Sequence, residues 1–331
     1  MTSPDTPAAW GFGLATVDEA SESLVEVFFP EPRLGPDGAP ELAVGESLDV
    51  DEETTRAAGH AELFPAAAAA DERRGVRSAV VYVALADLGA PPETVADGYL
   101  RLHLLSHRLV APRGLNVDGL LGVLPNVAWS DQGPFLADRY GEVASRFMAE
   151  GERISVRSVD KIPRMTDYIL PAGVRIADAD RVRLGAHLAD GTTVMHEGFV
   201  NFNAGTLGPS MVEGRISAGV RVGAGSDLGG GASIMGTLSG GGSEVISVGR
   251  DCLIGANAGI GVSLGDGCVV EAGLYLTGGT VVTMPDGARV KARELSGEGG
   301  LLYRRNSVSG AVEALPRGGE WGGLNPELHS N

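Results

Sequence analysis

A parallel β-helix preceded by an α+β domain is the fold that this sequence of 331 residues predicts. The main observation is that every sixth position in much of the second half is aliphatic, a period that belongs neither to an α-helix nor to a flat strand. The second observation is that 50 of the residues are glycine, which suits tight corners and closely stacked backbones. A period of six is typical of coils with three short walls, each of which points one aliphatic side chain inward.

This aliphatic ladder places the repeat between about 174 and 290. Its phase is lost at 201–215 and at 235–247, where we expect segments to leave the coil, either as loops that carry chemistry or as decoration. The expected inward positions are Ile176, Val182, Leu188, Val194, Val200, Ile216, Val222, Leu228, Ile234, Val248, Ile254, Ile260, Leu264, Val270, Leu276 and Val282.

The first part of the chain has the pattern of an α+β domain. Strands are predicted over 22–29 and 76–86, with loops over 35–75 between them. A helix is predicted after Pro91-Pro92, because apolar residues follow at helical spacing, and a second helix is predicted from about Pro134.

These patterns predict three domains. The N-terminal α+β domain covers residues 1–155, and the β-helix covers 156–290. A small C-terminal β piece covers 291–331, with a hairpin expected at 301–315 and a polar tail after it.

Net charge, the lack of long apolar runs and the number of cysteines argue against several classes of protein. The formal net charge of −17 argues against nucleic acid or an anionic membrane as a partner. The start of the chain does not have the pattern of a secretion signal, and no apolar run is long enough to cross a membrane. With only Cys252 and Cys268, neither a disulfide framework nor a cysteine metal site is expected. A soluble cytoplasmic protein is the expectation.

One basic cluster stands out against this acidic background. We interpret it as a site for a phosphorylated ligand, with ordinary solvated surface charge as the alternative. Its members are Arg289, Lys291, Arg293, Arg304 and Arg305.

The histidines give little support for metal chemistry. His103 and His107 are four residues apart on a predicted helix, but Leu104 stands where a zinc protease has its glutamate, so we expect ordinary helix surface. His187 and His196 are the only histidines in the repeat, too few for a three-histidine zinc site.

Four sequence runs point to a family. The runs MHEGFVNFNAGT at 195–206, VEGR at 212–215, GGGASIMGTLSGGG at 229–242 and VEAGLY at 270–275 resemble tetrahydrodipicolinate N-succinyltransferase in its actinobacterial form. The resemblance extends from about 115 to 310. It implies a left-handed parallel β-helix of the hexapeptide-repeat type, in a cytoplasmic homotrimer with active sites between subunits.

The resemblance also implies an activity. A succinyl group would pass from succinyl-CoA to the amine of 2-amino-6-oxopimelate, the open form of tetrahydrodipicolinate, in lysine and diaminopimelate biosynthesis. The preference for succinyl over acetyl depends on the resemblance alone.

Family resemblance makes Glu213 the catalytic carboxylate, either as a base for the amine or as a nucleophile that forms an anhydride. A surface glutamate paired with Arg215 is the alternative. The residues that the resemblance implies in substrate or coenzyme binding are Arg215, Gly230, Ser233, Ala256, Glu271, Ala272, Gly279, Lys291, Arg304, Arg305, Asn306 and Ser307.

A metal site is implied in the same way. Asp180 and Glu197 match carboxylates that hold Mg²⁺ at the subunit interface, and oxygen ligands suit that ion. Solvated or salt-bridged carboxylates are the alternative.

Two other functions compete with the succinyltransferase. One is another hexapeptide acyltransferase in which His196 is the general base. The other is a non-catalytic β-helix scaffold or an assembly protein related to carbonic anhydrases, which would not bind coenzyme A.

Overall fold

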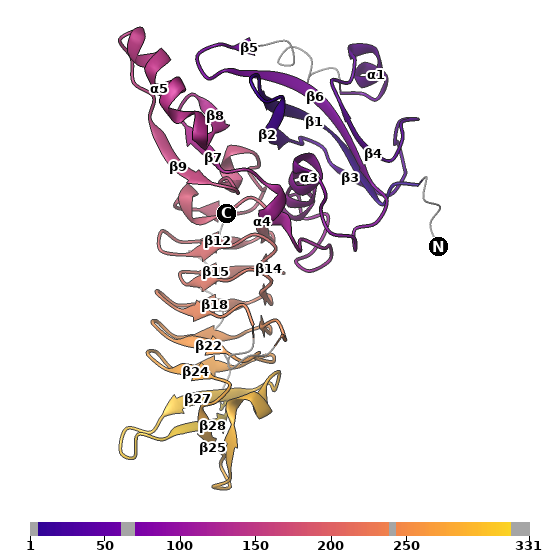
Figure 1. Cartoon of the computed structure of the whole chain (residues 1–331). Helices are drawn as coiled ribbons and strands as arrows, with labels where there is room; N and C mark the ends of the chain where they lie inside the picture. Colours follow the sequence, from indigo (N-terminus) through magenta and orange to yellow (C-terminus); the bar gives the residue numbers. More distant parts are fainter. Residues whose placement is uncertain (1–5, 61–69, 238–242, 319–331) are drawn as a thin grey trace. The chain divides into compact units, whose positions relative to one another are not determined.

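The computed structural model describes residues 6–60, 70–237 and 243–318, and its contacts divide the chain into two compact units (Figure 1). The first unit contains Met1–Val110 and Gly114–Pro163, and the repeat unit contains Ala111–Arg113 and Arg164–Asn331. The units thus divide after Pro163, and the C-terminal piece belongs with the coil. The limits at 155 and 290 remain sequence-based predictions of domain boundaries.

Several expectations fall outside the described residues. They concern the start of the chain, the part of the predicted loop at 61–69, the end of the glycine-rich run at 238–242 and the predicted tail from 319 onward. Within the described part, no helix has the length and apolar character that a membrane span requires.

The main sheet of the first unit is antiparallel and has the strand order β2-β1-β6-β4. The predicted strands at 22–29 and 76–86 are confirmed, whereas the central strand β1 was not predicted. The strands are β1 (Ala9–Asp18), β2 (Ser23–Phe28), β3 (Arg33–Leu34), β4 (Gly45–Leu48), β5 (Ala70–Asp71) and β6 (Val76–Leu85).

A second, three-stranded sheet and the helices complete the first unit. The helix after Pro91-Pro92 is confirmed as α3, whereas the segment at Pro134 is strand β8 and its helix begins only at Tyr140. The helices are α1 (Glu52–Ala57), α3 (Val95–Ser106), α4 (Leu120–Val123) and α5 (Tyr140–Ala149), and the strands are β7 (Val127–Ser130), β8 (Gly133–Leu136) and β9 (Val156–Asp160).

The expectation that His103 lies on the helix surface is wrong. Its side chain is fully buried, with Nδ1 donating to the Tyr99 carbonyl at 2.8 Å and Nε2 accepting from the Phe29 backbone N–H at 3.2 Å. Burial lowers the pKa of His103 to about 3, so the imidazole is neutral at pH 7.

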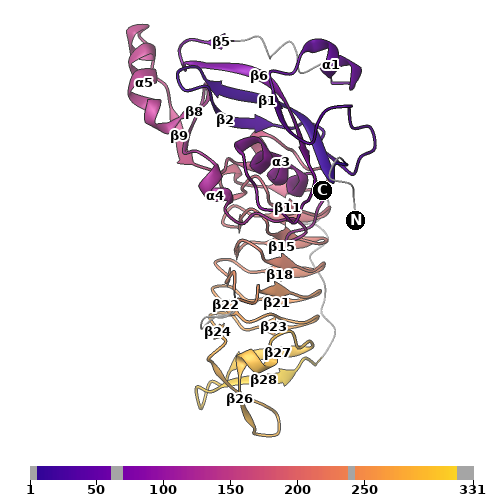
Figure 2. The same cartoon turned by 45° about the vertical axis from the view of Figure 1, so that its right-hand side comes forward.

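The repeat unit is a parallel β-helix with three walls, whose stacked coils are visible in Figures 1 and 2. The β12 wall contains β10 (Arg175–Ile176), β12 (Thr192–Val194), β15 (Ser210–Val212), β18 (Ser226–Leu228), β21 (Leu253–Ile254) and β23 (Val269–Val270). The β14 wall contains β11 (His187–Leu188), β14 (Gly205–Thr206), β17 (Arg221–Val222) and β20 (Ser247–Val248). The β16 wall contains β13 (Phe199–Val200), β16 (Arg215–Ile216), β19 (Ser233–Ile234), β22 (Gly259–Gly261) and β24 (Tyr275–Thr277).

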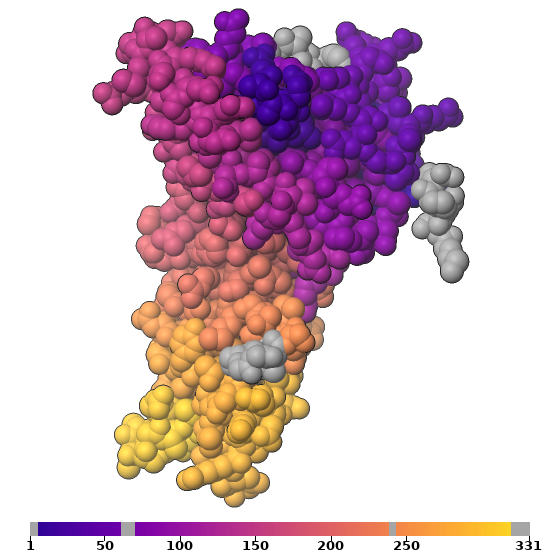
Figure 3. All heavy atoms as spheres, viewed as in Figure 1, coloured from indigo at the N-terminus to yellow at the C-terminus, as the bar shows by residue number. Residues whose placement is uncertain are grey.

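The aliphatic ladder is confirmed as the core of this coil. Of the sixteen expected inward residues all are buried except Ile176, which is half-buried in the first coil. Val194 pairs with Val212, eighteen residues later, whereas Val200 pairs with Ile216, sixteen residues later. The coils therefore differ in length, and the difference lies at their corners. Figure 3 shows their surface as bands that follow the sequence.

The expectation of a loop at 201–215 is wrong. Thr206 and Val212 keep the period of six and are fully buried, and Thr206 Oγ1 lies 2.6 Å from Thr192 Oγ1. The phase changes only between Val212 and Ile216, where the corner is two residues shorter. A hydroxyl at an inward position concealed the period, because Thr206 finds its hydrogen bonds inside the coil.

The described parts of the segment at 235–247, on either side of 238–242, leave the coil as expected. Between the inward residues Ile234 and Val248 the chain has eight residues more than one wall needs, and an isolated bridge joins Thr237 to Val245. A third change of phase, between Ile260 and Leu264, is again a corner two residues shorter.

The C-terminal piece continues from the last coil. The predicted hairpin at 301–315 is confirmed by the antiparallel pair β27 and β28, and β27 also pairs in parallel with β23. The strands are β25 (Val281–Thr283), β26 (Arg289–Lys291), β27 (Leu301–Arg305) and β28 (Val312–Pro316).

Candidate active site on one corner of the coil

One corner of the coil, between the β12 and β16 walls, collects most of the predicted site residues. Backbone N–H groups donate from each coil to the next at this corner: Glu213 to the Leu228 carbonyl, Gly229 to Ile254 and Gly255 to Val270, each at 2.8 Å, and Glu271 to Tyr303 at 2.9 Å. The segments that follow one another there, which we call the corner column, are 178–180, 195–198, 213–214, 229–231, 255–257, 271–273 and 304–305.

Glycine allows these corners to stack closely. A Cβ on Gly229 would lie 2.8 Å from the backbone nitrogen of Ala256, and a Cβ on Gly255 would lie 2.5 Å from that of Ala272. Larger side chains on the inner side of the column would therefore separate the coils. At the predicted residues Ala256 and Ala272, only a methyl group projects from the backbone, so the side chains of this part of the corner column occupy little space.

Glu213 lies at the shortened corner with a half-buried side chain. Its carboxylate points towards Gly230, since Oε2 would be 3.5 Å from a Cβ at that glycine. No ion pair joins Glu213 to Arg215 in the described residues, so the alternative of a structural pair is not supported by this geometry.

Arg215 instead contacts the predicted residue Ser233. Its Nη2 donates to Ser233 Oγ at 2.7 Å, across neighbouring strands of the β16 wall. The register continues from Ser233 to Gly259 and then to Tyr275, whose ring covers Gly259 so closely that a Cβ there would lie 2.3 Å from the ring.

Tyr275 was not singled out as a candidate from the sequence, although it ends one of the four runs. Its place in this row depends on unequal coil lengths: eighteen residues from Arg215 to Ser233, 26 from Ser233 to Gly259 and sixteen from Gly259 to Tyr275. The register was the signal that could have found it.

The basic end of the corner column is partly neutralised. Arg304 Nε donates to Glu313 Oε2 at 3.1 Å, and Asn306 Nδ2 donates to Glu313 Oε1 at 2.8 Å. The hydrogen bond from Asn306, followed by the contact with Arg304, lowers the pKa of Glu313. The backbone N–H of Arg305 donates to Glu271 Oε2 at 2.7 Å, and Ser307 is exposed in the turn that follows.

Gly279 and Lys291 lie elsewhere in the C-terminal part of this unit. Lys291 ends β26 opposite Val281, is exposed, and has no ion pair with a described residue. A Cβ on Gly279 would meet no described atom within 4 Å, so no close approach among the described residues explains this glycine. The structure does not bring these two residues into the corner column of their own chain.

The predicted metal carboxylates lie at the other end of the corner column, each beside an arginine. Arg164 Nη1 is 3.2 Å from Asp180 Oδ1, and Arg181 Nη2 is 3.5 Å from Glu197 Oε2. His196 Nδ1 is 2.9 Å from Glu197 Oε1. The described residues contain no group of three His, Cys, Asp or Glu side chains suited to a metal ion. The described part of one chain therefore shows no cluster suited to a cation.

Family models match two parts of the chain. Residues 124–164 match the middle part of tetrahydrodipicolinate N-succinyltransferase, and residues 245–278 match the hexapeptide repeat of succinyl-transferase. A crystal structure from Campylobacter jejuni, described as a 2,3,4,5-tetrahydropyridine-2-carboxylate N-succinyltransferase, is similar with a TM-score of 0.81 and 31% identity. The similarity covers 96% of this chain and 94% of that one.

Relatives described as 2,3,4,5-tetrahydropyridine-2,6-dicarboxylate N-succinyltransferase match nearly the whole chain. The protein of Salinispora tropica is 55% identical over 98% of each chain, and that of Vibrio cholerae is 49% identical over 98% of this chain and 99% of its own. The protein of Pseudomonas aeruginosa is 51% identical over 91% of this chain and 92% of its own. The similarity therefore includes the first unit, in which none of the four sequence runs lies. With its left-handed β-helix of hexapeptide repeats, the chain belongs to the tetrahydrodipicolinate N-succinyltransferase family.

Proposed function

We propose that this protein transfers the succinyl group of succinyl-CoA to the amine of 2-amino-6-oxopimelate, in lysine and diaminopimelate biosynthesis. The observation that carries the proposal is the corner column, which leads from the carboxylate of Glu213 past Ala256 and Ala272 to Arg304 and Arg305. A carboxylate and a basic end on one corner suit an acyl transfer from a donor that carries phosphates.

The reaction requires an unprotonated amine. Its nitrogen attacks the thioester carbon, the bond from carbon to sulfur breaks, and the proton lost by nitrogen passes to the departing thiolate of coenzyme A. We propose that Glu213 takes that proton first, as general base; attack by the Glu213 carboxylate itself, with an anhydride as intermediate, remains the alternative. Its carboxylate has no ion-pair partner in the described residues, and so is available for either role.

The neighbours of Glu213 suit an acceptor with two carboxylates. We propose that Arg215 binds one of them, because a guanidinium can donate two parallel hydrogen bonds to a carboxylate. Ser233 already accepts from Arg215 Nη2 at 2.7 Å, which holds the guanidinium on the β16 wall. Because Gly230 has no side chain, space for the acceptor is left beside the carboxylate of Glu213.

The donor is expected along the remaining length of the corner column. We propose that Ala256, Glu271 and Ala272 line its path and that the segment 304–307 contacts the phosphates. Gly279 and Lys291 lie away from this corner in their own chain, so they are proposed to contact a donor bound between neighbouring copies of a cytoplasmic homotrimer. Equilibrium sedimentation measures the oligomeric state, and a monomer that retains full activity would contradict this assignment.

Magnesium belongs to the same assembly proposal. Asp180 and Glu197 would act only together with their copies in other subunits, because one chain has no cluster of three ligands in the described part. If they bind Mg²⁺, replacing both with the corresponding amides will abolish the Mg²⁺-dependent rise in thermal stability. Equal stabilisation of the variant by Mg²⁺ would exclude this role.

The transferase assignment is tested with a coupled assay that offers succinyl-CoA and acetyl-CoA in parallel, with the amino-oxopimelate acceptor. We expect faster turnover with succinyl-CoA. Glu213→Gln should lower kcat by about 100- to 10,000-fold, the usual range for losing a general base. His196→Gln is the matched comparison, because His196 is exposed in the preceding coil of the same column.

Two other outcomes would replace this assignment. Near-normal turnover of Glu213→Gln with loss of activity in His196→Gln would establish the alternative, an acyltransferase that uses His196 as base. Calorimetry without saturable binding of succinyl-CoA would instead favour the non-catalytic scaffold.

A further inference from the structure

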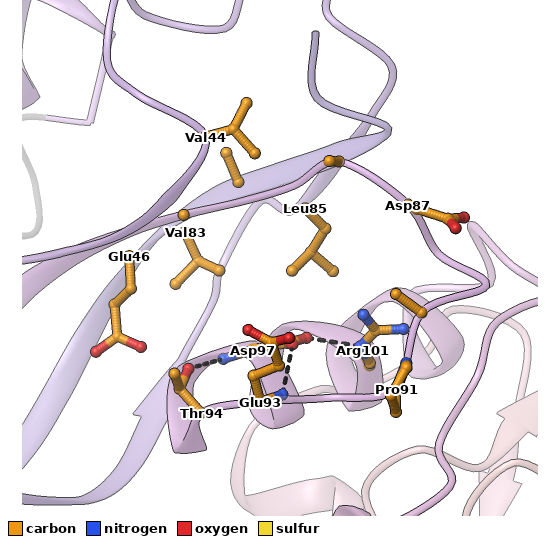
Figure 4. Close-up of a pocket in the computed structure, with 14 residues that line it drawn as sticks. Val44, Glu46, Val83, Leu85, Asp87, Pro91, Glu93, Thr94, Asp97 and Arg101 are labelled. Carbon is orange, nitrogen blue, oxygen red and sulfur yellow. Dashed lines mark hydrogen bonds and ion pairs between the residues drawn. The ribbon is translucent and has the colours of Figure 1, made fainter. Parts of the chain in front are cut away.

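A cavity of about 260 Å³ lies within the first unit, beside edge strand β4 and the beginning of α3 (Figure 4). Val44, Val83 and Leu85 provide apolar surface, and Glu46 and Glu93 contribute carboxylates. None of its lining residues belongs to the corner column, so the proposed reaction does not use this cavity. Its volume limits the ligand to a small molecule, since pockets for drug-sized ligands measure about 300–1,000 Å³.

Arg101 is a buried cation on this cavity, with 2% of its side chain exposed. Its Nε donates to Asp97 Oδ1 at 2.6 Å, and its Nη1 donates to the carbonyls of Leu88 and Asn116, both at 3.0 Å. No described residue accepts a hydrogen bond from Nη2. In Figure 4 the guanidinium lies beneath Leu85, at the cavity. A buried guanidinium with donors to spare is suited to a carboxylate ligand.

The other charges on the lining are negative. Four carboxylates, on Glu46, Asp87, Glu93 and Asp97, belong to the lining together with the single guanidinium, and only that of Asp97 is paired with it. Asp97 is paired with Arg101, whereas Glu46 and Glu93 have no ion pair in the part of the chain that the structure describes. This excess of negative charge disfavours a simple anion and favours a ligand that also carries ammonium groups.

We propose that this cavity binds a small amino acid with a second amino group, the chemical class of lysine. Its carboxylate accepts from Arg101 Nη2, its ammonium groups lie near Glu46 and Glu93, and its methylene chain packs on Val83 and Leu85. The net positive charge of such a ligand matches the lining, and each part of it has a partner of the right chemistry. The argument uses the first unit alone, so it does not depend on the proposed transferase function.

The ligand class is tested by isothermal titration calorimetry on the full chain. L-lysine is compared with L-norleucine, which lacks the second amine, and with 1,5-diaminopentane, which lacks the carboxylate. We expect one L-lysine per chain and at least about tenfold weaker binding of each analogue, because a hydrogen bond to a charged group contributes about 1.5–3 kcal/mol. Absence of saturable binding of L-lysine, or equal binding of L-norleucine, would overturn the proposal.

The location is tested with substitutions that leave the buried Arg101 in place. Glu46→Gln and Glu93→Gln should each weaken L-lysine binding about twofold to fivefold, as expected for partly exposed ion pairs. Glu53→Gln on α1 makes the same charge change away from the cavity lining and should leave the affinity unchanged. Thermal unfolding checks that all three variants fold. Equal losses in the three variants, or no loss in the first two, would place the ligand elsewhere.

Discussion

In the first unit the side chains that hold the core together come from distant segments, whereas in the repeat unit they come from neighbouring coils. The register of β1 with β6 joins Ala9 to Leu85, and the imidazole of His103 accepts from the Phe29 backbone, 74 residues earlier. In the coil, each inward residue stacks on one that is commonly sixteen or eighteen residues away. A stacked coil thus resembles other repeat proteins, in which each unit contacts only its neighbours.

The composition of the two cores differs in the same way. The first unit packs aromatic rings against one another, such as Phe12 and Tyr82 with centroids 5.0 Å apart, and it buries the ion pair of Arg101 with Asp97. The coil packs mainly one small or aliphatic side chain per wall, and its free cysteines are buried among them, as expected of a small apolar residue. The coil therefore depends on close backbone stacking, whereas the core of the first unit also contains buried polar side chains, such as His103 and Arg101, that are hydrogen-bonded.

The largest expected effect tests the backbone stacking of the coil. A Cβ on Gly198 would lie 2.2 Å from the Val212 carbonyl oxygen, so Gly198→Ala must push two coils apart. We expect a loss of about 3 kcal/mol in the free energy of unfolding, at the upper end for overpacking. Gly122→Ala on α4 is the control, because its Cβ meets nothing within 4 Å, and a gain of about 0.5 kcal/mol is expected there. Urea unfolding followed by circular dichroism measures both, and equal changes would refute the contrast.

The next effect tests the polar core of the first unit through pH. Because burial lowers the pKa of His103 to about 3, from 6.5 in an unfolded chain, the unfolded state binds more protons between these values. His103 therefore contributes its full stability above pH 6.5, and that contribution falls as the pH decreases towards 3. At pH 5 about 2 kcal/mol should be lost.

The measurement is the free energy of unfolding in urea at pH 7.5, 6.5 and 5. His103→Gln keeps an acceptor for the Phe29 N–H but does not titrate, so its stability should change less over this range. An identical pH dependence in the variant would show that other groups cause the loss.

A smaller effect concerns the exposed cation at the end of β26. Lys291 has no described ion-pair partner, and we expect Lys291→Ala to raise KM for succinyl-CoA about fivefold to tenfold with little change in kcat. Steady-state kinetics with the donor as the varied substrate measure this. A fall in kcat at constant KM would contradict a role in donor binding.

The smallest effect distinguishes a paired cation from an unpaired one. Arg304 already contacts Glu313, so Arg304→Ala should raise the donor KM only about twofold to threefold. Glu313→Gln removes that competition and should lower KM slightly. If Arg304→Ala had a larger effect than Lys291→Ala, the ion pair with Glu313 would have to open when the donor binds.

The sequence predicted most of the coil and only part of its corners. A ladder of aliphatic residues identifies the inward positions, because the interior admits only small or aliphatic side chains. It could not show whether 201–215 was a loop or a shortened corner, since Thr206 interrupts the pattern and satisfies its hydroxyl with Thr192. The place of Glu213 on a shortened corner therefore became clear only in the structure.

For the first unit the sequence determined less. Helical spacing identified α3 but placed His103 on its surface, because no local pattern shows that a backbone N–H 74 residues away will satisfy the imidazole. The cavity beside Arg101 is likewise lined by β4 and α3, which are far apart in the sequence. No periodic pattern in the sequence relates these two elements.

The sequence by itself thus determined the coil, its inward residues and the family whose runs it contains. Only the tertiary structure decided which outward residues share the corner column and which polar groups are buried in the first unit. The physical reason is that a period of six reports contacts between successive coils, whereas sites and buried polar pairs depend on coil length and on contacts between distant segments.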